Sequence, residues 1–113
     1  MDKTTQYRSL IKNTLTQHAK IVMNQCSQEM ETLLSFDEEH DQYLWLQVGW
    51  LHSHRVHGIT LHLRLHNGKI WIEQDWTESG IATELLKAGV SKNEIVLGFR
   101  NPKKRPLTEF AVA

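Results

Sequence analysis

The stretch that decides the fold is ITLHLRLHNGKIWIEQ, residues 59–74. Before its Asn67-Gly68 pair, apolar and polar side chains alternate strictly, and a period of two is typical of a strand with one buried face. Asn-Gly favours a two-residue type I′ turn, so we expect antiparallel strands over residues 56–66 and 69–74. This turn sets the register of the hairpin. The turn pairs His66 with Lys69. On the core side, Leu63 then faces Ile72 and Leu65 faces Ile70. On the outer face, Arg64 meets Trp71 and His62 meets Glu73.

A second predicted hairpin precedes this one. Residues 30–37 and 42–50 are rich in bulky apolar and aromatic side chains, and the polar run at 38–41 between them indicates a loop. For the strand over 42–50, we expect the inward set to be Leu44, Leu46 and Val48. The outward set would then be Tyr43, Trp45 and Gln47.

Helices are predicted on either side of these four strands. Residues 2–22 contain no Pro or Gly and repeat apolar side chains at helical spacing. Asp75 and Glu78 resemble a capping box for a second helix over about 77–88, which Gly89 ends. A single turn at 91–94, a short buried strand over 95–99 and a tail over 100–113 follow. The predicted fold is α+β: one domain over residues 1–113, with an antiparallel sheet (a four-strand meander plus a fifth strand) and two α-helices packed on one face.

Charge and composition exclude several classes of function. The 13 basic and 13 acidic side chains cancel, so the chain lacks the cationic surplus that neutralises duplex phosphates. Strong DNA binding by the chain alone is not expected. Its one cysteine, Cys26, cannot form an intrachain disulfide, and no apolar run approaches the roughly 20 residues of a membrane helix. We expect a cytoplasmic protein without membrane contact.

The histidines invite a metal hypothesis that their spacing does not support. His62 and His66 point the same way on one strand but stand about 13 Å apart, too far for one ion. His52 and His54 have no nearby cysteine or carboxylate to complete a tetrahedral site. His62 opposite Glu73 resembles an acid–base pair, but a cross-strand ion pair is the commoner explanation. No nucleotide-binding, metalloprotease or nucleophile motif occurs, so no enzyme, cofactor or metal is predicted.

Two parts of the chain are candidate surfaces for binding another protein. On the outer sheet face, large aromatic side chains lie among arginines, as at the centres of protein interfaces, although an ordinary half-exposed sheet is the alternative. The tail ends in an apolar stretch that should be ordered and dock on the domain or on a partner, with Phe110 as its anchor. Outward tryptophans also favour a homodimer or higher homo-oligomer. The predicted partner-binding residues are Tyr43, Trp45, His62, Arg64, Trp71, Glu73, Arg105, Thr108, Glu109 and Phe110.

Several segments together carry a family resemblance that none would carry alone. They are Val48-Gly49-Trp50, Arg55-Val56-His57-Gly58, Gly68-Lys69-Ile70-Trp71-Ile72, Gln74-Asp75, Thr77-Glu78, Gly80-Ile81-Ala82, Glu84-Leu85, Ala88-Gly89-Val90, Ile95-Val96-Leu97-Gly98-Phe99, Pro102, Arg105 and Thr108-Glu109-Phe110-Ala111. Over nearly its whole length, the chain resembles the XisI family, the excision controlling factors of the fdxN element in cyanobacteria.

The resemblance implies a compact α+β protein that is required, with a site-specific recombinase and the nuclease-like companion XisH, for programmed DNA excision in developing nitrogen-fixing cells. It implies no catalytic residue. The leading hypothesis is an accessory regulator that binds an XisH-like protein and controls DNA processing through it. The alternatives are direct DNA binding through Arg64, Lys103, Lys104 and Arg105, and, less favoured, a small enzyme.

Overall fold

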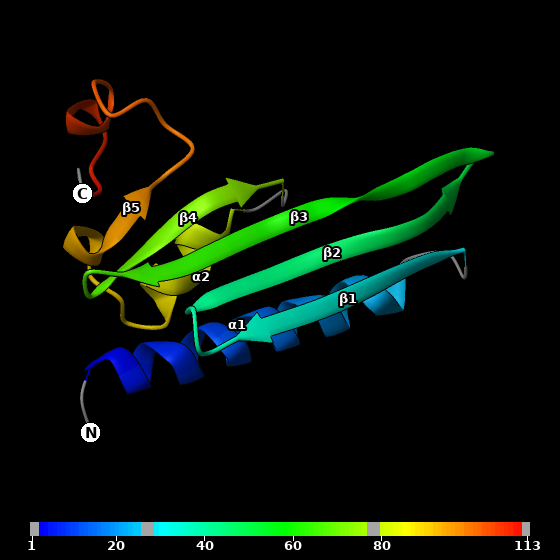
Figure 1. Ribbon diagram of the computed structural model, residues 1–113, viewed down its shortest axis with the longest axis horizontal. Helices are drawn as coiled ribbons and strands as arrows, with labels where there is room; N and C mark the ends of the chain where they lie inside the picture. Colours follow the sequence, from blue (N-terminus) through cyan, green and yellow to red (C-terminus); the bar gives the residue numbers. More distant parts are fainter. Residues whose placement is uncertain (1–2, 26–28, 77–79, 112–113) are drawn as a thin grey trace.

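The computed structural model describes residues 3–25, 29–76 and 80–111 and shows a five-stranded sheet with helices on one face (Figure 1). The strands follow the order β1-β2-β3-β4-β5, and every neighbouring pair is antiparallel except β4 and β5, which are parallel. The predicted α+β class is confirmed. The elements are α1 (Lys3–Gln25), β1 (Met30–Asp37), β2 (Gln42–Leu51), β3 (His54–His66), β4 (Lys69–Asp75), α2 (Ile81–Lys87), the 3₁₀ turn η1 (Lys92–Glu94), β5 (Ile95–Leu97) and the 3₁₀ turn η2 (Arg105–Leu107).

The β3–β4 hairpin forms at the predicted turn. Asn67 and Gly68 have φ angles of 53° and 75°, as a type I′ turn requires. Both predicted core pairs and the pair of Arg64 with Trp71 are confirmed. The prediction that His62 pairs with Glu73 is wrong. The register shifts between His62 and Leu63, so His62 pairs with Gln74 and Glu73 is the extra residue of a β-bulge.

The two faces of β2 are exchanged relative to the prediction. Tyr43 and Trp45 are buried, with exposed fractions of 0% and 1%, and they pair with the core residues Leu63 and Leu61 of β3. Gln47, on the same side of the strand, is half-buried. The predicted inward set, Leu44, Leu46 and Val48, therefore lies on the face opposite α1 and α2. Tyr43 and Trp45 are as bulky and apolar as Leu44 and Leu46, so alternation alone could not decide which set faces the core.

The core fills the space between the sheet and the two helices. α1 and α2 place their apolar stripes against the inner sides of β2, β3, β4 and β5. The largest side chains that are fully buried in this core are Ile11, Leu15, Tyr43, Trp45, Leu61, Leu63, Ile70, Ile72, Ile81, Leu85, Ile95 and Val96. No helix among the described residues is long and apolar enough to cross a membrane.

Helix α2 begins later than predicted. Gly80 precedes it with a φ of 83°, so helix cannot run through this position from residue 77. The Asp75 carboxylate accepts a hydrogen bond of 2.8 Å from the Ile81 N–H, and Asp75 thus acts as a start signal. Its predicted capping partner Glu78 lies outside the described residues.

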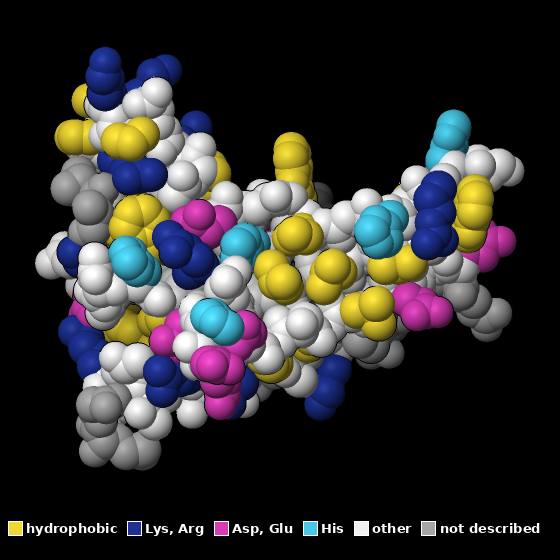
Figure 2. All heavy atoms as spheres, viewed as in Figure 1, with side chains coloured by type: hydrophobic (Ala, Val, Ile, Leu, Met, Phe, Trp, Pro, Cys, Tyr) yellow, Lys and Arg dark blue, Asp and Glu magenta, His cyan; other side chains and the backbone are white. Residues whose placement is uncertain are grey.

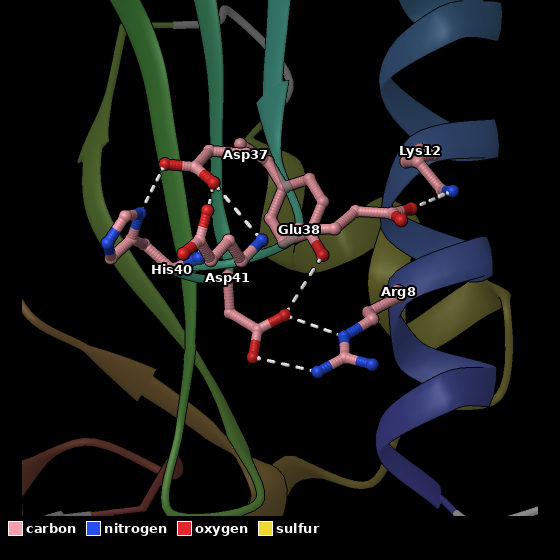
Figure 3. Close-up of polar contacts among 8 residues, drawn as sticks. Arg8, Lys12, Asp37, Glu38, His40 and Asp41 are labelled. Carbon is pink, nitrogen blue, oxygen red and sulfur yellow. Dashed lines mark hydrogen bonds and ion pairs between the residues drawn. The ribbon is translucent and has the colours of Figure 1, made fainter.

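The turn between β1 and β2, residues 37–41, is tied to α1 (Figure 3). Arg8 donates hydrogen bonds of 2.7 and 3.2 Å to Asp41, and Lys12 forms an ion pair with Glu38. These contacts with the Arg8 guanidinium hold the pKa of Asp41 below its usual range. Within the turn, Asp37 accepts bonds from the N–H groups of Glu39 and His40. We call residues 37–41 the acidic turn.

Residues 100–111 of the tail run along the edge of the sheet. Ala111 forms an isolated parallel bridge with Val96, and its N–H donates to the Ile95 carbonyl at 2.9 Å. Phe110 packs against the core, as the prediction of an apolar anchor requires. The segment carrying Arg105 is thereby held beside β4 and β5.

Candidate interaction site on the open face of the sheet

The sheet face opposite the helices presents two distinct groups of side chains (Figure 2). One group, the polar cluster, joins β3, β4 and η2. The other, the apolar stripe, follows every second residue of β2. The polar cluster consists of His62, Arg64, Trp71, Glu73 and Arg105, and the apolar stripe of Leu44, Leu46, Val48 and Trp50.

Two arginines stack on one tryptophan in the polar cluster. The guanidinium carbons of Arg64 and Arg105 lie 5.6 and 5.2 Å from the centroid of the Trp71 ring, which is cation–π distance. The His66 ring meets Trp71 edge-on, with centroids 5.8 Å apart. Arg105 also donates to the carbonyls of Gly98 and Arg100, at 3.3 and 3.2 Å. The tail thus contributes Arg105 to a cluster whose other residues come from β3 and β4.

The cluster contains polar atoms whose hydrogen-bonding capacity is not used. Arg64 Nε lies 3.8 Å from Glu73 Oε1, which is an ion pair but longer than a hydrogen bond. The Glu73 side chain also lies against the backbone of Gly98. A Cβ atom added to Gly98 would stand 2.2 Å from Glu73 Oε1. Among the described residues, the buried side-chain atoms without a hydrogen-bond partner are Trp45 Nε1, His62 Nε2, Arg64 Nε, Trp71 Nε1 and Glu73 Oε1. Four of these five atoms belong to the polar cluster.

Burial controls the protonation of His62. It lowers the pKa of the imidazole from its ordinary value of 6.5, with Glu73 opposing this effect and Arg64 adding to it. His62 is therefore neutral at neutral pH. In that form it has one ring N–H to donate and one ring nitrogen to accept.

We expect acidification through the histidine range to destabilise the protein through His62. The unfolded chain takes up a proton near pH 6.5, whereas the folded chain takes it up at the lowered pKa, so the unfolded state binds more protons in that window. The contribution of His62 to the free energy of unfolding should be fully present above pH 6.5. It should decrease as the pH falls toward the lowered pKa. Melting temperatures measured from about pH 8 to 5 should fall less steeply in His62→Gln than in the wild type. Equal slopes would contradict this assignment.

The apolar stripe is half-buried at Leu44, Leu46 and Val48 and exposed at Trp50. Trp50 is 50% exposed, and Arg55 of β3 stacks on it at 5.5 Å. Leu33 of β1 and Ile59 of β3 pair with Leu46 from either side and are 46% and 37% exposed. Cross-strand partners share a face, so these residues widen the stripe where it crosses the middle of the sheet.

The predicted site residues divide into three groups. His62, Arg64, Trp71, Glu73 and Arg105 come together in the polar cluster. Thr108, Glu109 and Phe110 lie on the tail: the Thr108 hydroxyl donates to the Arg105 carbonyl at 2.8 Å, Glu109 pairs with Lys92 at 2.9 Å, and Phe110 packs inward. Tyr43 and Trp45 belong to the core, so their prediction as partner-binding residues is wrong.

The sequence prediction missed the apolar stripe. The sequence does contain a sign of it, because large apolar residues occur on both faces of β2. Whichever face is directed to the core, the other face still carries apolar side chains. Such a strand is expected when both faces of a sheet are eventually covered.

One set of possible metal ligands occurs among the described residues. Ligand atoms of Asp37, Glu39 and His40 lie within 4.8 Å of one another, and all three residues are exposed. Hydrogen bonds within the acidic turn, including 2.7 Å between His40 Nδ1 and Asp37 Oδ2, account for this closeness without an ion.

This fold is that of a single small α+β domain, a five-stranded and mostly antiparallel sheet with two helices. The family model of the XisI protein matches residues 1–112, and the chain belongs to the XisI family.

Two crystal structures from Anabaena variabilis resemble the chain over its full length. A XisI-like protein is 35% identical, with a TM-score of 0.88, and the match covers 97% of this chain and 99% of that one. The fdxN element excision controlling factor XisI is 43% identical, with a TM-score of 0.76, and the match covers 99% of this chain and 100% of that one. No curated protein matches the chain.

Proposed function

We propose that this chain is an accessory regulator of DNA element excision, which acts in the cytoplasm by binding an XisH-like protein and, through it, a site-specific recombinase. The observation that carries the proposal is the full-length likeness, at 43% identity, to a protein described as an excision controlling factor. We infer that the chain does no chemistry itself. His62 and Glu73 resemble an acid–base pair in the sequence, but the β-bulge takes Glu73 out of register with His62, which supports no catalytic role.

The polar cluster is the surface that we assign to the partner. Tryptophan and arginine are the residues most enriched at the energetic centres of interfaces, and here Arg64 and Arg105 flank Trp71. The unused donors and acceptors of the cluster favour a partner with polar groups that can meet them. A complementary surface would therefore combine an apolar or aromatic centre with carboxylate and amide groups.

Reversing the charge of Arg64 should weaken capture of the partner. The Arg64→Glu variant loses the stacking on Trp71 and sets a second carboxylate beside Glu73, so co-expression with an XisH-like protein should give at least a tenfold loss, about 1.4 kcal/mol. Capture is measured by co-purification and quantified by calorimetry. The matched control is Lys20→Glu, the same charge change on an exposed position of α1. Equal capture by wild type and Arg64→Glu, at equal melting temperature, would remove the cluster from the interface.

One feature favours direct DNA contact as a second candidate function. The segment 100–105 carries Arg100, Lys103, Lys104 and Arg105 without an acidic residue, next to Arg64 of the polar cluster. A mobility-shift titration of the chain alone distinguishes the two functions. If the chain acts only through a protein partner, it should bind duplex DNA with a Kd no tighter than about 10⁻⁴ M at physiological salt. Tighter binding that weakens steeply with salt would favour direct DNA contact.

A further inference from the structure

We propose that a groove on the tail binds an acidic segment of another protein that carries one large apolar side chain. The groove, which we call the tail groove, has a volume of about 410 Å³, and its lining includes the apolar Leu97, Leu107 and Phe110 and the basic Arg100 and Lys104. The ligand places its apolar side chain in the groove and its carboxylates beside the cations. This inference goes beyond the proposed function, because it concerns different side chains and specifies the chemistry of what they bind.

Hydrogen-bonded turns hold the tail groove in shape. The Leu107 N–H donates to the Lys104 carbonyl at 3.1 Å. Pro106 restricts the backbone of η2, and the N–H and hydroxyl of Thr108 both donate to the Arg105 carbonyl, at 3.0 and 2.8 Å. A ligand therefore meets a surface that is already in one conformation, and binding loses little free energy to the ordering of side chains and backbone.

Apolar surface is available in the tail groove. Leu107 is 85% exposed, and Leu97 and Phe110 pack only partly against the core while they also line the groove. One exposed leucine is ordinary on a protein surface, but apolar side chains gathered around a hollow are typical of a ligand pocket. The volume lies near the lower end of the range of about 300–1,000 Å³ for such pockets, so the groove suits one or two side chains.

The charge around the tail groove is positive although the chain as a whole is neutral. The first six residues of the tail contain four cations and no carboxylate, and Figure 2 shows Lys and Arg side chains gathered there, at the upper left. Arg100, Lys103 and Lys104 form no ion pair with any residue that the structure describes. Glu109, which also lines the groove, pairs with Lys92 at 2.9 Å. The unpaired cations favour a ligand that carries carboxylates.

The apolar lining decides between an acidic protein segment and nucleic acid. Phosphate groups are bound by cations and polar donors, and they gain little from Leu97, Leu107 and Phe110. A protein segment in which Asp and Glu flank a leucine or an aromatic residue uses the cations and the apolar lining together. The combination therefore points to a protein ligand.

Selection from a library of random peptides displayed on phage tests the proposal. Peptides retained by the wild-type chain should be enriched in Asp and Glu around one Leu, Phe or Trp. The most enriched peptide, labelled with fluorescein, is then titrated by anisotropy, and Leu107→Ser should weaken its binding at least about tenfold. Leu107 is 85% exposed, so the fold should persist. The matched control is Leu51→Ser, the same change at a 47% exposed position of β2, which should bind the peptide like the wild type.

A charge reversal tests the role of the cations. Lys104→Glu should weaken binding of the same peptide at least about tenfold, because it sets a carboxylate against the carboxylates of the ligand. The matched control is Lys20→Glu on α1, which should bind like the wild type. Arg64→Glu should also bind the peptide like the wild type and lose only capture of an XisH-like protein. Failure of the proposed partner site and failure of the tail groove therefore give different results.

Several outcomes would overturn the proposal. They are a selection that enriches no acidic peptide with a large apolar side chain, or an enriched peptide whose binding is unchanged by Leu107→Ser or by Lys104→Glu. A duplex that binds tightly to the wild type, weakly to Lys104→Glu and unchanged to Leu107→Ser, without enrichment of any acidic peptide, would also overturn it. That last result would show that the cations of the tail contact phosphate, and it would favour direct DNA contact.

Discussion

Replacing Trp45 with alanine is expected to lower the free energy of unfolding by about 3–5 kcal/mol, a large part of the stability of a domain of this size. Trp45 is 1% exposed, and it lies in the core with the His18 ring edge-on at 5.4 Å between centroids. Alanine would leave a cavity that the sheet cannot close, because β2 is held by β1 and β3 on both sides. Urea denaturation followed by circular dichroism measures the change.

The matched control for Trp45→Ala is Trp76→Ala. Trp76 is 76% exposed, so its removal should change the free energy of unfolding by less than about 1 kcal/mol. Similar effects of the two substitutions would mean that β2 has the opposite face inward. Leu44, Leu46 and Val48 would then be the core set, and the apolar stripe would not exist.

Gly49→Ala should destabilise the protein by about 3 kcal/mol or more, because it adds a methyl group where two strands meet too closely. A Cβ on Gly49 would stand 2.1 Å from the Glu29 carbonyl oxygen and 2.8 Å from the Met30 Cα, and both are backbone atoms. The φ of 153° at Gly49 adds strain for any other residue. Relief requires the start of β1 to move away from β2, so the urea midpoint should fall sharply.

Gly58→Ala is the matched control for Gly49→Ala. Gly58 lies on β3, and a Cβ there would meet nothing within 4 Å. Alanine should be tolerated within about 0.5 kcal/mol, since surface substitutions away from special contacts usually fall in that range. A Gly49→Ala variant as stable as Gly58→Ala would show that β1 does not approach β2 this closely.

The sequence predicts the fold well wherever the chemistry of alternate residues differs. In β3, apolar Leu61, Leu63 and Leu65 alternate with polar side chains, and the Asn67-Gly68 turn fixes their pairing with β4. β2 offers no such contrast, because Tyr43 and Trp45 are as apolar as Leu44 and Leu46. The inward set is decided by pairing with β3, which the sequence of β2 alone does not encode.

The candidate site was predictable in its residue types but not in its assembly. Arg64 opposite Trp71 follows from the turn, and that pair was predicted correctly. The position of Glu73 depends on a β-bulge that leaves no pattern in the sequence. Arg105 reaches Trp71 because the tail returns along β5, a contact between segments far apart in the chain.

The parallel pairing of β5 with β4 also has a consequence for the order of folding. β1 to β4 form three successive hairpins, whose contacts are local and inexpensive in loop entropy. β5 must instead wait for the whole crossover through α2, and it then holds β4 through three residue pairs from Ile70 and Ile95 onward. The strand and its tail should therefore join last. Because that tail carries Arg105, the cover over Trp71 is completed only in this final step.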